Sequence, residues 1–340
     1  MSRFAYVAAA NGPFVVETRP APAPGPGEVL VRVHACGVCH SDDFVKTGGF
    51  PGLQLPRVPG HEVAGVVAGL GAGVRGWREG DRVGVGWHGG HCFVCDACRR
   101  GDFIVCREGR VCGISYDGGY ADHLVVPAEA LARIPDGLSD VEAAPLLCAG
   151  ITTFNALRHS PARAGDLVAI QGLGGLGHLA VQFARNMGFR TVALARGADK
   201  RALALELGAH EYVDTTREPP AAALQARGGA SVVLATAPNA DAVTAVVDGI
   251  APGGQLLLVA AVLEALPVSA FALIGARRSI QGWPSGTAKD SEETLAFAAA
   301  FGIRPRVETY PLARVSDAFE RMHSGKARFR AVLTMEDATG

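Results

Sequence analysis

Short runs of alternating apolar and polar residues, separated by glycines and prolines, characterise the first third of the chain. They lie at 14–17, 28–33, 62–68 and 81–85. Alternation with a period of two gives each segment one apolar face, so each run predicts a β-strand. The turn residues between the runs predict an antiparallel, barrel-like β domain.

From about Leu167 the pattern changes, and strand-like apolar runs alternate with helical periodicity. Strands are predicted at 167–171, 190–195, 211–213, 231–235, 254–260 and 279–282, and helices at 175–187, 199–207 and 239–249. This alternation predicts a parallel, doubly wound sheet, which places the chain in the α/β class. After about Thr287, two helical patterns and a strand-like run at 329–333 are expected to fold back onto the first domain. The predicted domains are 1–151, completed by 287–340, and 152–286.

Composition indicates a well-buried globular protein. The 340 residues are 49% hydrophobic and 19% charged, with a formal net charge of -1 and no basic block, so the electrostatic footprint of a nucleic-acid binder is missing. The longest apolar stretch, 256–276, contains Glu264 and Pro267, and it predicts a buried strand followed by a short helix instead of a membrane span. The first residues lack the pattern of a signal peptide, and we expect a cytoplasmic protein.

A glycine-rich turn, Gly172-Leu173-Gly174-Gly175-Leu176-Gly177, lies between a predicted strand and a predicted helix. This context fits a dinucleotide-binding turn. The first glycine permits the tight turn, the second lets the backbone approach a pyrophosphate, and the third permits close contact between helix and strand. In a chain with 44 glycines the same pattern can also be a purely structural turn.

Four cysteines lie within fifteen residues of one another, at Cys92, Cys95, Cys98 and Cys106. A loop with this spacing can wrap tetrahedrally around zinc, and because sulfur fills every position, the predicted zinc is structural. Four thiolates around one divalent zinc ion would leave a formal charge of -2, which Arg99, Arg100 and Arg107 would offset. The alternatives are incidental or disulfide-bonded cysteines and a DNA-binding zinc finger, but no basic recognition helix lies beside the loop.

A second candidate metal site is dispersed over Cys39, His61 and Cys148. Two cysteines and one histidine would leave the fourth position of a zinc ion open, as catalysis requires. Spacing alone does not join these residues, and His61 by itself fits a buried structural histidine better than a metal ligand. Cys36 and Cys39 also form a C-x-x-C pair, but no thioredoxin-like βαβ pattern surrounds them.

Together these motifs, in this order, resemble the zinc-containing medium-chain alcohol dehydrogenases over essentially the whole chain. The segments that carry the resemblance are Cys39-His40-Ser41-Asp42, Gly60-His61-Glu62, the four-cysteine loop and the glycine turn. The resemblance implies a GroES-like antiparallel β-barrel domain and a Rossmann domain. It also implies two zinc ions per chain, a catalytic one on Cys39, His61 and Cys148 and a structural one on the four-cysteine loop. Polyol dehydrogenases of the family usually have glutamate where Cys148 stands, so the chain is more similar to the alcohol and cinnamyl-alcohol branch.

The resemblance also implies roles for the neighbours of these ligands. Glu62 matches a carboxylate that can approach the metal, and Asp42 matches one that orients the ligand histidine. Ser41 matches a hydroxyl that passes on the substrate proton, and His40 matches a position that contacts the cofactor pyrophosphate. Some members end the proton relay in a histidine where this chain has Phe44, so the later part of the proton path stays open.

Several aromatic residues are at positions that resemble those lining the substrate pockets of the family. They are Phe44, Phe50 and Trp87, with Tyr116 and Trp283 as further candidates. The alternative is ordinary core packing. If these residues line the pocket, the substrates are apolar primary alcohols or aldehydes.

The residues after the second predicted strand of the Rossmann domain bear on the choice of cofactor. NAD-binding folds usually have an acidic residue about 20 residues beyond the glycines, and here Arg196 stands in that region, followed by Lys200 and Arg201. A guanidinium can bind the 2'-phosphate of NADP, which an acid would repel. NAD stays possible, because Arg196 could stack on adenine and Asp199 lies close by.

The sequence thus predicts a zinc-dependent alcohol dehydrogenase or aldehyde reductase that prefers NADP. The alternatives are a family member specialised for a glutathione adduct or an amino alcohol, and a non-catalytic, NADP-sensing zinc protein. We expect a homodimer or homotetramer joined through the nucleotide domains near 279–283, where an edge strand could pair with its twin. A small molecule is the expected partner, with neither nucleic acid nor membrane.

Overall fold

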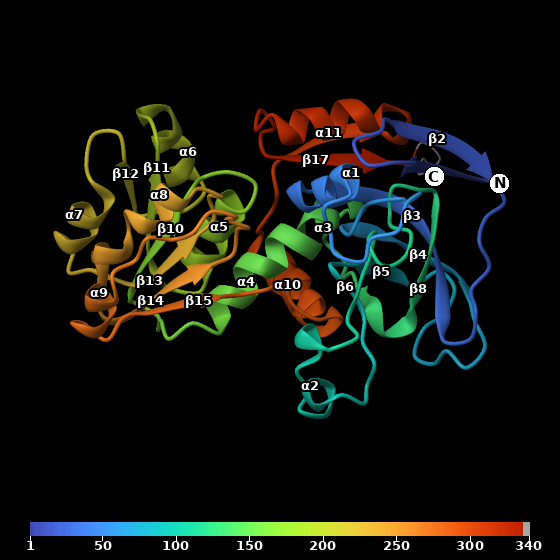
Figure 1. Cartoon of the computed structure of the whole chain (residues 1–340), viewed down its shortest axis with the longest axis horizontal. Helices are drawn as coiled ribbons and strands as arrows, with labels where there is room; N and C mark the ends of the chain where they lie inside the picture. The colour runs from blue at the N-terminus through green and yellow to red at the C-terminus, as the bar shows by residue number, and fades with distance from the viewer. Residues whose placement is uncertain (336–340) are drawn as a thin grey trace. The chain divides into compact units, whose positions relative to one another are not determined.

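The computed structural model describes residues 1–335, which fold into two compact units (Figure 1). The first unit contains Met1–Ile151 and the chain from Ser285 onward, and the second contains Thr152–Pro284. The division follows the change of apolar pattern, because the first unit is built on short strands and the second on strands that alternate with helices.

A seven-stranded, mainly antiparallel sheet forms the centre of the first unit, in the order β16-β17-β3-β4-β5-β9, with β8 also paired to β3. A β1–β2 hairpin and the short β6–β7 pair complete it. The strands are β1 (Ser2–Val7), β2 (Phe14–Arg19), β3 (Glu28–Val38), β4 (Val63–Leu70), β5 (Arg82–Val85), β6 (His88–Gly90), β7 (Arg110–Val111), β8 (His123–Pro127), β9 (Leu131–Arg133), β16 (Val307–Pro311) and β17 (Arg330–Thr334).

The end of the chain folds back onto this sheet, as the apolar pattern of the tail predicts. Strand β17 pairs antiparallel with β3, from Ala331 opposite Val38 to Thr334 opposite Ala35. This distant partner explains why β3 runs to Val38, five residues beyond the predicted strand. Strand β16, which the sequence did not predict, pairs in parallel with β17.

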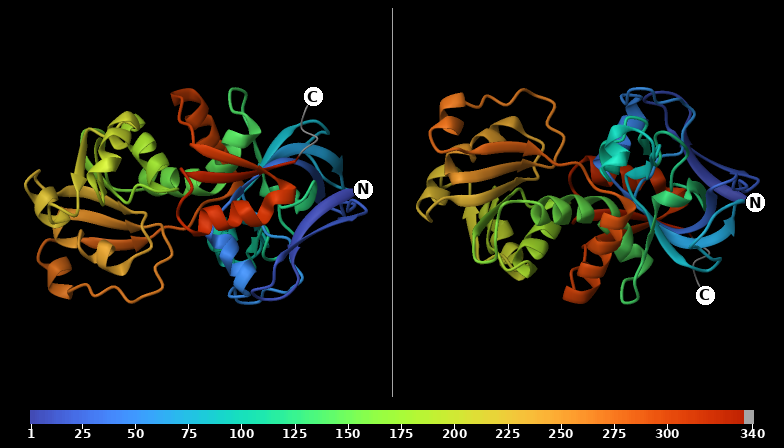
Figure 2. Two further views of the ribbon diagram at one scale, coloured as in Figure 1. Left: turned by 90° about the horizontal axis from the view of Figure 1, so that it is seen from above. Right: turned by 90° about the horizontal axis from the view of Figure 1, so that it is seen from below.

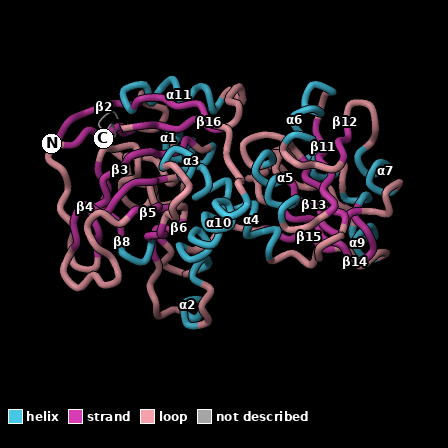
Figure 3. Tube along the Cα trace, turned by 180° about the vertical axis from the view of Figure 1, so that it is seen from behind, coloured by secondary structure: helices cyan, strands magenta, loops and turns pink. Residues whose placement is uncertain are grey.

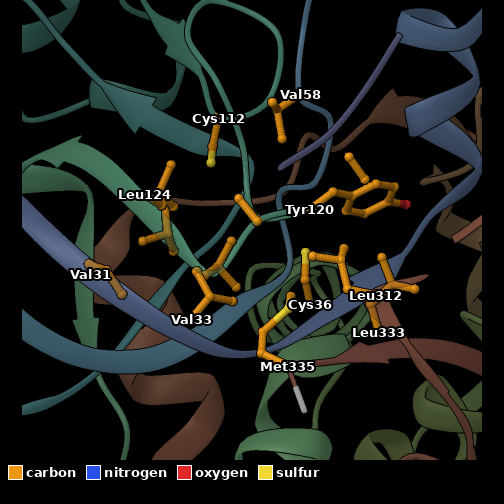
Figure 4. Close-up of a cluster of buried hydrophobic side chains, with 14 of the residues drawn as sticks. Val31, Val33, Cys36, Val58, Cys112, Tyr120, Leu124, Leu312, Leu333 and Met335 are labelled. Atoms are coloured by element: carbon orange, nitrogen blue, oxygen red, sulfur yellow. The ribbon is translucent and has the colours of Figure 1, made fainter. Parts of the chain in front are cut away.

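The core of the first unit joins side chains from both ends of the chain (Figure 4). Val31, Val33 and Cys36 of β3 lie in one buried cluster with Leu333 and Met335, and the ring of Tyr120 is fully buried there. Short helices cover the sheet or connect its strands, namely α1 (Asp43–Thr47), α2 (Asp96–Arg99), α3 (Asp140–Pro145), α10 (Ala288–Phe301) and α11 (Val315–His323).

The second unit is a six-stranded parallel sheet in the order β12-β11-β10-β13-β14-β15. Counted from β10, this is the 3-2-1-4-5-6 order of a dinucleotide-binding fold. The strands are β10 (Leu167–Gln171), β11 (Arg190–Ala195), β12 (Glu211–Asp214), β13 (Ala230–Ala235), β14 (Ile250–Leu258) and β15 (Ser279–Gly282). The helices are α4 (Ile151–Arg158), α5 (Gly177–Asn186), α6 (Arg201–Glu206), α7 (Pro220–Gln225), α8 (Ala240–Thr244) and α9 (Ala270–Ile274). Figure 2 shows helices on either side of this sheet, and Figure 3 shows how strand and helix alternate along it.

Two predicted elements differ in detail. The helix predicted at 239–249 ends at Thr244 and is followed by a separate turn of 3-10 helix, Val247–Gly249, where a Cβ on Gly249 would lie 2.8 Å from Leu224. The apolar stretch 256–276 begins in buried β14, but its short helix α9 is exposed, with Phe271 at 80% exposure. Within residues 1–335, no helix is long and apolar enough to cross a membrane.

Candidate metal centres and cofactor turn

One buried cluster in the first unit brings together side chains from three distant segments. Ligand atoms of Cys39, His61, Glu62 and Cys148 all lie within 4.8 Å of one another. Cys39 follows β3 and precedes a short 3-10 helix, η1 (His40–Asp42), while His61 and Glu62 precede β4. The structure thus assembles the dispersed residues that the sequence could not join by spacing.

Cys148 lies in an unusual stretch of backbone, the π-helix η4 (Leu146–Gly150) between α3 and α4. A π-helical turn has one residue more than an α-helical turn, and such turns occur mainly at functional sites. The wider turn follows Pro145, which cannot donate a backbone hydrogen bond. We infer that this local distortion helps to direct the Cys148 thiol into the cluster.

The donor atoms of the cluster fit a zinc ion. The sulfurs of Cys39 and Cys148 are 3.8 Å apart. This is about the separation of two sulfurs that each lie about 2.3 Å from one tetrahedral zinc. The Nε2 of His61 and the Oε2 of Glu62 are buried and have no hydrogen-bond partner in the described part of the chain. A metal ion would satisfy the imidazole nitrogen, which is costly to bury alone.

Asp42 holds His61 in place. Its Oδ1 lies 3.2 Å from Nδ1 of His61, and its Oδ2 accepts hydrogen bonds from the backbone N–H of Cys39 at 2.9 Å and from the hydroxyl of Tyr120 at 2.8 Å. A carboxylate beside Nδ1 keeps the proton on that nitrogen and leaves Nε2 free for a metal. Sequence reasoning missed Tyr120, because an aromatic residue in the glycine-containing loop before β8 gives no sign of its hydroxyl partner.

Arg330 is a second residue that sequence reasoning missed. It enters from β17 near the end of the chain, is 5% exposed, and its guanidinium pairs with Oε1 of Glu62 and also donates to the carbonyl of Val38 at 3.3 Å. Two thiolates and the Glu62 carboxylate would be balanced in charge by a divalent ion and this one guanidinium. The only signal in the sequence was an arginine within an otherwise apolar terminal strand.

The electrostatics of the cluster favour a thiolate at Cys39. The Cys148 thiol donates to the sulfur of Cys39, which lowers the pKa of Cys39 well below its usual value and raises that of Cys148. Burial raises the pKa of Glu62 to about 7, although the Arg330 charge opposes this shift. A thiolate at Cys39 is the form that binds zinc.

The four cysteines of the predicted structural site form a second group, on a lobe that includes α2. Their sulfurs also lie within 4.8 Å of one another, with Cys92 to Cys106 at 3.5 Å and Cys95 to Cys106 at 3.8 Å. Two backbone N–H groups point at sulfur, from Cys92 to Cys106 and from Cys95 to Cys92. Four sulfurs at these separations enclose a tetrahedral ion completely. Arg99, Arg100 and Arg107 are exposed on the same lobe, where their charge can offset that of the thiolates.

Three of the predicted pocket residues form a continuous aromatic wall. Ring centroids lie 5.9 Å apart between Phe44 and Phe50, 6.1 Å between Phe50 and Trp87, and 5.0 Å between Trp87 and His61. The aromatic wall therefore reaches the imidazole of His61. Tyr116 is not part of it, because its hydroxyl donates to the carbonyl of Gly89 and its ring packs under Arg110.

The two remaining candidates next to Cys39 lie in η1. Ser41 is half-buried, and His40 is exposed. The ring of His40 stacks on that of His323, at the end of α11, with centroids 6.3 Å apart.

The glycine turn lies in the second unit, at the carboxyl end of β10 and the start of α5. Gly172 has a φ of +95°, which favours glycine, and a Cβ on Gly177 would lie only 2.0 Å from the carbonyl oxygen of Gly172. Space around Gly174 is open. Strands β10 and β13 are the point where the strand order reverses, which is where dinucleotides bind in such sheets. Gly175 and Leu176 complete the turn before α5.

Arg196 follows β11 directly and is exposed. No carboxylate pairs with its side chain among residues 1–335, so the guanidinium is available to a ligand. Lys200 is half-buried in the short 3-10 helix, Ala198–Lys200, that follows. The backbone N–H of Gly197 donates to Asp214 at the end of β12, at 2.9 Å, which fixes the turn.

Comparison with protein families finds two matches that together span most of the chain. Residues 25–136 match the alcohol dehydrogenase GroES-like domain, and residues 175–300 match the zinc-binding dehydrogenase domain. The chain is 49% identical over 308 residues to the alcohol dehydrogenase patD of Penicillium expansum, which covers 91% of this chain and 90% of the relative.

Solved structures are similar over nearly the whole chain. CAD from Helicobacter pylori, solved with NADP(H), has a TM-score of 0.86 and 28% identity, with 99% of this chain and 98% of that chain covered. Acetophenone reductase from Geotrichum candidum, solved with NAD, has a TM-score of 0.86 and 27% identity, with 99% and 98% covered.

Proposed function

Because the chain belongs to the zinc-containing medium-chain alcohol dehydrogenase family, we propose that it interconverts apolar primary alcohols and their aldehydes, with NADP as the preferred cofactor. The chain is a zinc-dependent alcohol dehydrogenase that uses a nicotinamide cofactor. The observation that carries the proposed substrate class is the aromatic wall, which runs from Phe44 to Trp87 and ends against His61.

We propose that Cys39, His61 and Cys148 would hold the catalytic zinc, with the buried carboxylate of Glu62 beside them. When bound, zinc would polarise the oxygen of the substrate and lower the pKa of an alcohol. Asp42 keeps Nε2 of His61 directed at the metal, and Ser41 accepts the proton that the substrate releases. The aromatic wall excludes water and selects apolar carbon chains over polyols.

A structural zinc on Cys92, Cys95, Cys98 and Cys106 completes the proposal of two ions per chain. Metal analysis tests it, since two zinc ions per chain support the proposal and one contradicts it. None of the eight cysteines, all within residues 1–335, forms a disulfide, which fits the reducing cytoplasm that we propose as the location.

The preference for NADP is supported by Arg196, which lies at the end of β11, where an acidic residue would select NAD, and which has no carboxylate partner among residues 1–335. Lys200 adds a second cation on the same turn. Similar structures hold either cofactor, one NADP(H) and one NAD, so the argument depends on these side chains. We assign His40 and the turn Gly172–Gly177 to the cofactor phosphates.

We also propose that two copies pair along the edge strand β15 of the second unit. The neighbouring segment exposes Leu263, Phe271 and Ile274 at 75–87%, and an apolar surface of this kind next to an open strand edge favours association. Light scattering during gel filtration measures the oligomer directly, and a monomer contradicts this part of the proposal.

A substrate panel assayed in parallel with NADH and NADPH tests the main proposal. We expect kcat/KM to be higher for aromatic and medium-chain aldehydes than for polyols or their oxidised forms, and higher with NADPH. Arg196→Gln should lower kcat/KM for NADPH about tenfold and leave the NADH value nearly unchanged, since only the phosphate contact is lost. Arg163→Gln is the matched control, because this exposed arginine precedes β10 and lies at the opposite end of the strand from the glycine turn. Equal loss with both cofactors, or faster turnover of polyols, contradicts the proposal.

A further inference from the structure

A cavity of about 470 Å³ opens on the first unit, away from both groups of cysteines. Its charged lining consists of three arginines and two carboxylates, Arg19, Arg57, Arg110, Glu28 and Asp117. His123 also lines it, and burial lowers the pKa of this imidazole, which favours its neutral form. The charged side chains sum to one positive charge.

Two of the arginines are held flat by aromatic rings. The guanidinium carbon of Arg19 lies 4.1 Å from the ring centre of Phe4, and that of Arg110 lies 4.7 Å from the ring centre of Tyr116. Tyr116 is fixed in turn by its hydrogen bond to Gly89. Stacking restrains a guanidinium by its face and leaves its N–H edge free to bind an anion.

Only some of the N–H donors of these guanidinium groups bond within the cavity, and the side chains of Arg19 and Arg110 are open to solvent. Each carries five N–H donors, but Asp117 accepts only from one nitrogen of Arg19 at 3.1 Å and one of Arg57 at 3.2 Å. The same carboxylate also accepts the backbone N–H of Val58 at 3.1 Å. Within residues 1–335, Arg110 has no carboxylate partner, and the Nε of Arg57 is buried without an acceptor.

We propose that this cavity binds the phosphate or carboxylate group of a small metabolite. Either group would supply the missing acceptors, and each matches the planar N–H edge of arginine in a bidentate geometry. The volume exceeds that of the anion alone, and the buried Phe4 and Leu124 in the wall offer apolar contact to the rest of the molecule. None of these residues belongs to the zinc ligands or the glycine turn, so the site is independent of the proposed function.

The test uses calorimetric titration of the zinc-loaded enzyme with saturating NADPH, which fills the phosphate sites of the cofactor. Inorganic phosphate and succinate are the two probes, and sodium chloride at equal ionic strength is the control. We expect binding of one anion per chain, with a dissociation constant near 1 mM, for at least one probe. The tighter probe shows whether phosphate or carboxylate is the natural group. If neither probe binds more tightly than chloride, the proposal is overturned.

Variants then place the bound anion. Arg110→Gln removes a guanidinium that has no carboxylate partner, so the fold should not change, and we expect the affinity for the probe to fall at least tenfold. Arg75→Gln, an exposed arginine outside the cavity, should bind as the wild type does. Turnover without added anion should be equal in all three proteins, which separates this site from the catalytic one. Unchanged binding by Arg110→Gln overturns the proposal.

Discussion

The two cysteine-rich centres of the first unit differ in how the chain builds them. The four-cysteine lobe takes all its sulfurs from fifteen consecutive residues, and Cys92 and Cys106 are only half-buried. The other centre takes Cys39, His61 and Cys148 from three segments, buries two of them almost completely, and adds Arg330 from the end of the chain. Local spacing suffices to enclose an ion, whereas an open coordination position needs walls that only the whole sheet supplies.

We call the centre formed by Cys39, His61 and Cys148 the open centre. The largest effect is expected when this centre loses a sulfur. Cys39→Ala should lower turnover by about 10³-fold or more, because polarisation of the substrate oxygen contributes several kcal/mol to catalysis. The lobe should keep its zinc, and circular dichroism and NADPH binding should show an intact fold. Turnover equal to that of the wild type would refute the catalytic assignment of the open centre.

Loss of a sulfur from the lobe should have the opposite effect. In Cys98→Ala the remaining three sulfurs bind zinc weakly, and the lobe then loses the cross-link that holds it. We expect one zinc per chain in place of two and a Tm lower by at least about 5 °C, with kcat per folded molecule changed less than about threefold. Cys112→Ala, a buried cysteine outside both centres, should keep both ions. A kcat loss like that of Cys39→Ala would contradict a purely structural lobe.

The same difference explains what the sequence could predict. The fold class and the family followed from apolar periodicity and from short motifs, and the structure and the relatives confirm both. The four-cysteine lobe could be predicted because its sulfur donors are close together in the sequence. The joining of Cys39, His61 and Cys148 depended on resemblance to a family, since no local rule relates residues 109 positions apart.

Other features of the open centre could not be predicted because they arise only from tertiary contacts. Arg330 reaches Glu62 because β17 pairs with β3, a pairing between the two ends of the chain. Tyr120 reaches Asp42 from the barrel core. The assignments of zinc ligands and cofactor residues are still predictions, and the variants described above and below test them.

The hydroxyl of Tyr120 can be tested on its own, because Tyr120→Phe removes this group and almost no volume. Asp42 then loses one of its three donors and holds His61 less firmly, so we expect zinc affinity at the open centre to fall about three- to tenfold. Competition with a chelator measures this loss, and the lobe zinc should not respond. Tyr6→Phe is the control. If zinc affinity falls equally at both centres, the variant destabilises the protein generally, which contradicts a positioning role for the Tyr120 hydroxyl.

The smallest predicted effect concerns Glu308, which anchors the segment that supplies Arg330. Its carboxylate binds the Arg321 guanidinium at 2.7 and 3.0 Å and accepts the backbone N–H of Arg328 at 2.9 Å. The Arg321 contact lowers the pKa of Glu308 to about 2, from about 4.3 in an unfolded chain. Glu308→Gln should cost about 1 kcal/mol of unfolding free energy at pH 7, because the solvent-screened pair contributes less than the full shift.

The pH dependence gives this prediction its sign. Below about pH 5 the unfolded chain takes up a proton at this position before the folded chain does, so the contribution of Glu308 to stability declines as the pH falls and is lost near pH 2. Urea unfolding of wild type and Glu308→Gln should therefore give a difference in free energy that is smaller at pH 4 than at pH 7. Glu79→Gln, at an exposed site, should show no such change. A difference that is equal at both pH values contradicts the ion pair as its source, and the anchoring of Arg330 would then come from the pairing of β17 with β16 and β3.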